Sequence, residues 1–219
     1  MKKGVIIGVI VAVIIAVLTT YLVSQPNVDL SSGNAEKKMG TVDTSTGSPV
    51  LGSSLAPITI VEFGDYQCPQ CDKWYLSVRP DIERDYIQTG KAKLVFVDLA
   101  FFGPDSKKAA QASYCAEDQG KFWEYHGMLY ENQGGINDGW ASPQNLKRFA
   151  SELNLDTSSF NDCLDSGKYQ KRVENNIKIA TQNGASGTPT FILISDENQK
   201  RIEGAQPYQV FKQELDSLL

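Results

Sequence analysis

The sequence has little of what several classes of protein need. Its 219 residues include one histidine, His126, and no basic tract follows Lys2 and Lys3. After those two lysines the chain carries 19 basic and 26 acidic side chains, a net charge of −7, which argues against a nucleic-acid partner. No internal repeat is present, which argues against a solenoid architecture.

Charged residues are also missing from residues 4–23, a run rich in valine and isoleucine. About 20 residues of helix span roughly 30 Å of hydrocarbon. The run is longer than the apolar core of most cleavable signal peptides, so we expect residues 1–23 to form an uncleaved transmembrane signal-anchor, with a cleaved signal peptide as the alternative. Lys2 and Lys3 would then stay in the cytoplasm. The expected location is a single-pass protein of the cell membrane whose folded part lies on the extracytoplasmic side, where disulfides persist.

Apolar periodicity is scarce from residue 24 to residue 55, where serine, glycine, threonine, asparagine, aspartate and lysine dominate. This composition predicts a flexible extracytoplasmic tether. The folded domain is expected to comprise residues 56–219.

The pattern of elements in residues 56–219 predicts an α/β fold. A buried strand at Ile58–Phe63 precedes a helix that begins at Cys68 and contains Pro80, where we expect a kink or break. The order that follows is a second strand, a helical block at about residues 103–184, two further strands and a final helix. A βαβ unit, an inserted helical subdomain and a ββα unit indicate a small sheet with helices on both faces.

The four cysteines are the most informative residues in this arrangement, and two of them form the motif Cys68-Pro69-Gln70-Cys71. If Cys68 lies at the helix N-terminus, Pro69 takes the first helical position, where its missing N–H costs nothing. Free amide donors and the helix dipole there favour a thiolate at Cys68, and Cys71 follows one turn later. The motif alone leaves redox catalysis, a zinc ribbon and a structural bridge open.

Three segments decide between these possibilities: Val61–Cys71, Gln119–His126 and Gly187–Thr190. Together with the layout, they resemble the DsbA-like thiol–disulfide oxidoreductases of the thioredoxin fold. The resemblance extends over about residues 48–219 and implies a thioredoxin-like fold for the domain.

The resemblance also implies roles for residues of the motif and of the third segment. Cys68 would be the exposed nucleophile and Cys71 the resolving thiol. Pro189 matches a proline that the family holds in the cis form beside the disulfide. Thr188 would offer backbone groups to an extended substrate segment, and Pro69 and Gln70 would also contact the substrate.

Two polar residues near the motif, Glu62 and Gln70, bear on its chemistry. A lone glutamate at a strand end, such as Glu62, is most often solvated. The family instead places an acid beneath the cysteines, where a desolvated carboxyl group with a raised pKa could exchange protons with Cys71. Gln70 departs from the histidine that oxidising members often carry, so we predict a less oxidising potential than that of histidine-containing relatives.

The second cysteine pair, Cys115 and Cys163, falls in two helices of the inserted block. Its spacing matches no zinc pattern, so we expect no metal site and favour a structural disulfide over two free buried thiols. His126 lies four residues after Phe122 and four before Tyr130, on one helical stripe. We therefore expect a packed structural histidine rather than a catalytic or metal-binding one.

The resemblance implies an extracytoplasmic oxidoreductase that introduces disulfides into unfolded or reduced secreted or membrane proteins, without a cofactor. It also implies a quinone-linked membrane partner of the DsbB or vitamin-K-epoxide-reductase type for reoxidation. A reductase or isomerase that uses the same residues is one alternative. A non-catalytic extracytoplasmic binding domain with two structural disulfides is another.

Overall fold

The computed structural model describes residues 42–219. The expected anchor at residues 1–23 and residues 24–41 of the expected tether lie outside this part of the chain. Among residues 42–219, no helix combines the length and the apolar character needed to cross a membrane.

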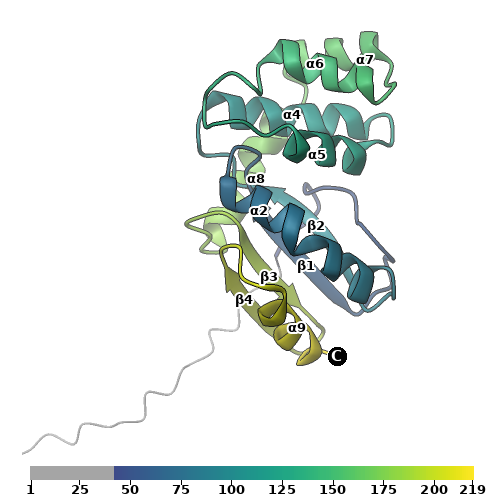
Figure 1. Cartoon of the computed structure of the whole chain (residues 1–219), viewed down its shortest axis with the longest axis vertical. Coiled ribbons are helices and arrows are strands. Elements are labelled where there is room, and N and C mark those ends of the chain that lie inside the picture. The colour runs from purple at the N-terminus through teal and green to yellow at the C-terminus, as the bar shows by residue number, and fades with distance from the viewer. Residues whose placement is uncertain (1–41) are drawn as a thin grey trace, which may run out of the picture. The chain divides into compact units, whose positions relative to one another are not determined.

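A four-stranded mixed sheet forms the centre of the domain (Figure 1). Its strands are β1 (Ile58–Gly64), β2 (Ala92–Asp98), β3 (Thr190–Ile194) and β4 (Gln199–Glu203), in the order β2-β1-β3-β4. β1 pairs in parallel with β2, whereas β3 pairs antiparallel with both β1 and β4. A parallel pair needs a crossover connection, which is formed here by the helices that follow the cysteine motif.

The helices follow the strand–helix order predicted from the sequence. They are α2 (Pro69–Ser77), α3 (Arg79–Ile82), the π-helical turn η1 (Glu83–Ile87), α4 (Pro104–Glu117), α5 (Phe122–Glu131), α6 (Pro143–Glu152), α7 (Thr157–Ser166), α8 (Gln170–Gln182) and α9 (Tyr208–Asp216). The helix that begins at the motif breaks at Val78, two residues before Pro80, as the proline predicts. The inserted block of α4 to α8 separates β2 from β3, so the thioredoxin-like α/β fold with a helical insertion is confirmed.

The two faces of the sheet are covered by different helices. Trp74 of α2 and Phe211 of α9 pack with Ile58 and Ile60 on one face. Ile179 of α8 packs with Val61 and its neighbours on the other. Figure 1 shows α4 to α7 stacked at one end of the sheet, where the N-terminus of α2 also lies. The motif at that N-terminus therefore faces the helical insertion.

The segment before β1 differs from the tether expected at residues 24–55. Leu51 forms an isolated antiparallel bridge with Leu94, and each backbone N–H donates to the other's carbonyl oxygen, at 2.9 and 3.0 Å. Ser48 donates its N–H to the Phe96 carbonyl oxygen at 2.7 Å, and its hydroxyl accepts from the Phe96 N–H at 2.9 Å. Residues 42–51 thus cover the free edge of β2, and the ordered domain begins before residue 56. The polar composition of residues 42–51 did not predict this pairing with β2, because the pairing uses mainly backbone groups.

Candidate active site

Cys68 occupies the N-cap position of α2, and Pro69 follows in the first turn. The backbone N–H of Cys68 donates to the Asp65 carbonyl oxygen at 3.0 Å, and its own carbonyl oxygen accepts from the Asp72 N–H at 3.1 Å. The chain therefore enters the helix through a tight turn that ends at the first cysteine. The free N–H groups of the first turn of α2 therefore lie next to Cys68, whose side chain makes no cap hydrogen bond.

The cis peptide bond between Thr188 and Pro189 lies opposite this turn. The Cys68 thiol donates to the Thr188 carbonyl oxygen, with the sulfur 3.3 Å away. The structure thus brings together two segments 120 residues apart. This juxtaposition is the one that the family resemblance implied.

Cys68 is less accessible than the expected exposed nucleophile. Only 3% of its surface is exposed, while Pro69 and Gln70 are exposed beside it. Thr188 lies over the sulfur, and the Gln133 side chain donates to the Cys68 carbonyl oxygen at 3.2 Å. Thr188 is thus the residue in direct contact with the Cys68 sulfur.

The two thiols of the motif have opposite acidities in the reduced form described here. A hydrogen bond from the Cys71 thiol lowers the pKa of Cys68 from its usual 9 to about 6, with further help from Thr188 and from the N–H groups of Cys71 and Gln70. The Thr188 hydroxyl has no hydrogen-bond partner within residues 42–219. Burial raises the pKa of Cys71 well above 9, and the neighbouring Cys68 adds to this. At neutral pH, Cys68 is a thiolate and Cys71 a thiol.

Glu62 lies within the fold rather than in solvent, with 1% of its surface exposed. It shares the face of β1 with Ile58 and Ile60, which is the face that α2 covers. Neither carboxyl oxygen has a hydrogen-bond partner within the described residues. Burial raises the pKa of Glu62 to about 8, against the attraction of the Arg79 cation, so this acid is protonated at neutral pH.

The turn before Cys68 is held by polar contacts that the sequence analysis did not predict. The buried Asp65 carboxylate accepts from the N–H groups of Gln67, Phe101 and Phe102 at 2.8, 2.9 and 3.2 Å. The Gln67 side chain donates to the Ser106 hydroxyl at 2.8 Å and accepts from the Asn137 N–H at 2.7 Å. The sequence signal for these contacts was the pair of polar residues, Asp65 and Gln67, directly after an apolar strand. Polar groups at such a position are buried only when they have hydrogen-bond partners.

His126 lies in the aromatic centre of the insertion and is fully buried. Its Nδ1 atom is 3.0 Å from the Tyr66 hydroxyl. Burial lowers the pKa of His126 well below its usual range, so the ring stays neutral. These contacts agree with the expected packed histidine.

A disulfide joins the second cysteine pair, Cys115 of α4 and Cys163 of α7, with their Cα atoms 5.8 Å apart. Both helices belong to the insertion. The bond closes a loop over a sequence separation of 48 residues.

Comparisons with known proteins match this chain to a family. A family model described as thioredoxin matches residues 44–217. The "Disulfide bond formation protein D" of Bacillus subtilis is 33% identical over 176 residues, which cover 79% of this chain and 78% of the relative. The chain belongs to the DsbA-like branch of the thioredoxin-fold family.

Solved structures agree with this assignment. The crystal structure of oxidised BdbD from Bacillus subtilis has a TM-score of 0.74 and 31% sequence identity, covering 82% of this chain and 96% of that chain. The crystal structure of α-DsbA1 from Wolbachia pipientis has a TM-score of 0.69 and 25% identity, covering 77% of this chain and 89% of that one. The likeness extends over the sheet and the inserted helices together.

Proposed function

We propose that this protein is an extracytoplasmic thiol–disulfide oxidoreductase that introduces disulfides into secreted or membrane proteins. Its class, protein disulfide oxidoreductase, follows from the family to which it belongs. The low pKa of Cys68 is the main support for the oxidising direction, in which electrons pass from the substrate to the enzyme. A thiolate that is stable in the reduced enzyme drives oxidation of the partner.

The reaction is thiol–disulfide exchange. In the oxidised enzyme a substrate thiolate attacks the Cys68 sulfur, the Cys68–Cys71 bond breaks, and its electron pair goes to Cys71. A second substrate thiolate then attacks the substrate sulfur of the mixed disulfide and releases Cys68 as a thiolate. The substrate loses two electrons and the enzyme gains them.

The surrounding residues support each step. A protonated Glu62 supplies the proton that Cys71 needs as it leaves, since burial keeps Cys71 a thiol. Thr188, with Pro189 holding the turn, presents backbone groups to an extended substrate beside Cys68. Pro69 and Gln70 form the exposed rim of this contact.

The location and the redox partner belong to the same proposal. The charge-free run of residues 4–23 supports an uncleaved anchor, which would keep the domain near a quinone-linked membrane reoxidant of the DsbB or vitamin-K-epoxide-reductase type. Exchange itself uses the two cysteines and requires no cofactor.

Trapping tests the proposal. The variant Cys71→Ala, expressed in the native host, should accumulate mixed disulfides between Cys68 and secreted proteins, seen as adducts that a reductant releases. The matched variant Cys68→Ala should form none, because Cys71 is fully buried. A complete lack of adducts would favour a non-catalytic binding domain. An equilibrium with glutathione that favours the oxidised enzyme would favour the reductase direction.

A further inference from the structure

The carbonyl oxygen of Cys68 accepts a hydrogen bond from a side chain of the helical insertion. The amide nitrogen of Gln133, in the loop between α5 and α6, donates to it at 3.2 Å and to the Tyr66 carbonyl oxygen at 2.7 Å. These two carbonyl groups lie on either side of Gln67, so a single amide group uses both of its hydrogens on the turn that enters α2. The contact joins residues 65 positions apart in the chain.

Cys68 depends on such contacts because its own side chain does not fix the start of the helix. A serine or aspartate at the N-cap accepts a hydrogen bond from an N–H of the first turn. Cys68 has N-cap dihedral angles of φ −79° and ψ 117°, but its side chain makes no cap hydrogen bond. It is held through its backbone instead: its N–H donates to the Asp65 carbonyl oxygen at 3.0 Å, and its carbonyl oxygen accepts from Gln133 and from the Asp72 N–H.

The loop that carries Gln133 holds the same turn at a second point. The Asn137 N–H donates to the side-chain oxygen of Gln67 at 2.7 Å, and the Gln67 amide nitrogen donates to the Asn137 side-chain oxygen at 3.3 Å. With Gln133, the loop thus contacts Tyr66, Gln67 and Cys68 in succession. The α5–α6 loop therefore fixes the backbone that carries the reactive sulfur.

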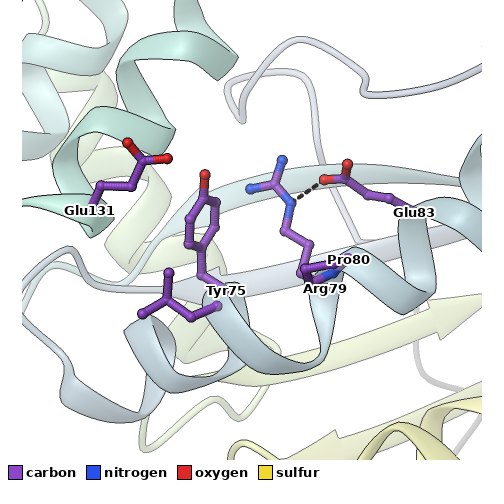
Figure 2. A pocket seen from close by; sticks show the side chains of 6 residues that line it. Tyr75, Arg79, Pro80, Glu83 and Glu131 are labelled. Atoms are coloured by element: carbon purple, nitrogen blue, oxygen red, sulfur yellow. Dashed lines mark hydrogen bonds and ion pairs between the residues drawn. The ribbon is translucent and has the colours of Figure 1, made fainter.

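The charged side chain at the end of α5 faces a different part of the surface. Figure 2 shows Glu131 beside a surface pocket of about 260 Å³ between α2, α3 and α5, which Tyr75 and the ion pair of Arg79 and Glu83 also line. Gln133 follows Glu131 by two residues and reaches the motif turn instead. The contact of this loop with Cys68 is therefore made by a neutral group.

Three acids of β1, the turn and α2 also lie in the segments around Cys68. Glu62 is protonated at neutral pH, the Asp65 carboxylate is paired with backbone N–H groups, and burial raises the pKa of Asp72 in the first turn of α2. All three stay in place in a variant at position 133. A neutral substitution there therefore tests geometry at constant charge.

We propose that Gln133 is a positioning residue for thiol–disulfide exchange, which holds the Cys68 peptide so that its sulfur stays in contact with Thr188 and the first turn of α2. The sulfur is 3.3 Å from the Thr188 carbonyl oxygen in this arrangement, and the N–H groups of Gln70 and Cys71 stabilise its thiolate. Without the amide of Gln133, the Cys68 peptide is free to tilt and these contacts weaken. Cys68 then becomes a poorer leaving group. The inference rests on the proposed function and extends it to a residue outside the motif.

The test is the pH dependence of Cys68 alkylation by iodoacetamide in the reduced full-length protein, together with its equilibrium with glutathione. Gln133→Met keeps the length of the side chain and removes both donors. The acid dissociation constant of the Cys68 thiol should fall about tenfold, which raises its pKa above the value of about 6 in the wild type. The equilibrium at pH 7 should then move about fivefold towards the oxidised enzyme, because the thiolate stabilises the reduced form.

Gln119→Met is the matched control within the insertion. The Gln119 amide also joins backbone groups, accepting from the Asp156 N–H at 2.8 Å and donating to the Asp156 carbonyl oxygen at 3.1 Å, but it lies between α4 and α5. This variant should lose stability in denaturant while its alkylation curve stays that of the wild type. A shift of the alkylation curve in Gln119→Met as large as that in Gln133→Met would mean that any loosening of the insertion has this effect, and would overturn the specific role of Gln133.

Gln133→Glu is nearly equal in size to the wild type and keeps the test available if Gln133→Met does not fold. Its carboxylate cannot donate to two carbonyl oxygens, so the alkylation curve should shift in the same direction and stay shifted at roughly 1 M salt, which screens a charge effect. A wild-type curve in Gln133→Met, or a shift in Gln133→Glu that salt removes, would overturn the inference. A wild-type Cys68 that is inert to iodoacetamide and does not cycle with Cys71 would instead overturn the proposed function.

Discussion

At the scale of single residues, the acidity of Cys68 depends on hydrogen-bond donors that lie within one turn of α2 and in the Thr188 segment. Those in α2 are the Cys71 thiol and the backbone N–H groups of Cys71 and Gln70, all of them neutral. The Gln70 side chain is exposed beside them and adds no charge. Further lowering of the pKa of Cys68 would therefore require a cation, and position 70 is where one could be introduced.

We predict that Gln70→His makes the protein more oxidising. An imidazolium beside the sulfur stabilises the thiolate, so the pKa of Cys68 should fall below about 6. The equilibrium with glutathione should move about tenfold towards the reduced enzyme, which corresponds to roughly 30 mV. Gln70→Glu is the control and should shift both quantities in the opposite direction. A shift of the same sign in both variants would contradict a charge effect.

Glu62 gives a prediction about stability and pH. Its pKa rises from 4.5 to about 8 on folding, so between these values the folded state binds a proton that the unfolded state has released. The contribution of Glu62 to stability should therefore fall as pH rises from about 5 to 8, by an amount on the order of a few kcal/mol. The Glu62→Gln variant has no titratable group at this position, so its stability should not show this decline with pH.

Urea unfolding of both proteins at four pH values between 5 and 8 measures the effect. The difference in unfolding free energy should move in favour of Glu62→Gln as pH rises. Asp98, whose pKa burial raises to about 6, contributes the same slope to both proteins and cancels in the difference. Parallel curves would show that Glu62 titrates normally.

At the scale of elements, the motif turn and the helical insertion form one hydrogen-bonded unit. Asp65 and Gln67 precede Cys68 and contact the Phe101–Phe102 segment, Ser106 and Asn137. The insertion therefore fixes the direction in which the chain enters α2. Sequence patterns predicted both elements but not this contact, because its partners lie 36 to 70 residues away from the motif turn.

The disulfide between α4 and α7 strengthens the insertion alone. Cys115→Ala with Cys163→Ala should lower the free energy of unfolding by about 2–4 kcal/mol, since the bond closes a long loop in the unfolded chain. The pKa of Cys68 should not change, because its hydrogen-bond donors belong to α2 and to Thr188. Denaturant unfolding and the pH dependence of Cys68 alkylation measure the two effects. A large shift in the alkylation curve would mean that the insertion holds α2 through this bond.

At the scale of the whole molecule, sequence reasoning predicted the order of the elements and the position of the motif. It succeeded where a local pattern determines a local structure, as with Cys68 and Pro69 at the start of α2 and the break before Pro80. It missed groups whose role depends on a distant neighbour. Asp65 looks like an ordinary loop carboxylate until the fold brings the N–H groups of Phe101 and Phe102 to it.

The first residues of the domain also could not be predicted from local sequence patterns, because their contacts are with distant residues. Residues 42–51 have the composition of a linker, yet Gly47 lies so close to β2 that an added Cβ would be 2.8 Å from Val95 Cγ1 and 3.0 Å from the Phe96 carbonyl oxygen. Arg172 of α8 also donates to the Thr46 carbonyl oxygen at 2.9 Å. These contacts make the segment part of the fold of the whole domain.

We therefore predict that a chain beginning at residue 42 is more stable than one beginning at residue 56. The shorter chain loses the four hydrogen bonds that Ser48 and Leu51 make with β2, each of them worth about 0.5–1.5 kcal/mol, and uncovers the strand edge. Its unfolding free energy should fall by roughly 2–5 kcal/mol, and it should aggregate more readily. In the full chain, Gly47→Val should reproduce the loss through the clash with β2, whereas Leu55→Ser, at a side chain 90% exposed, should not. Equal stability of the two chains would show that residues 42–51 contribute nothing to the fold, which the bridge between Leu51 and Leu94 argues against.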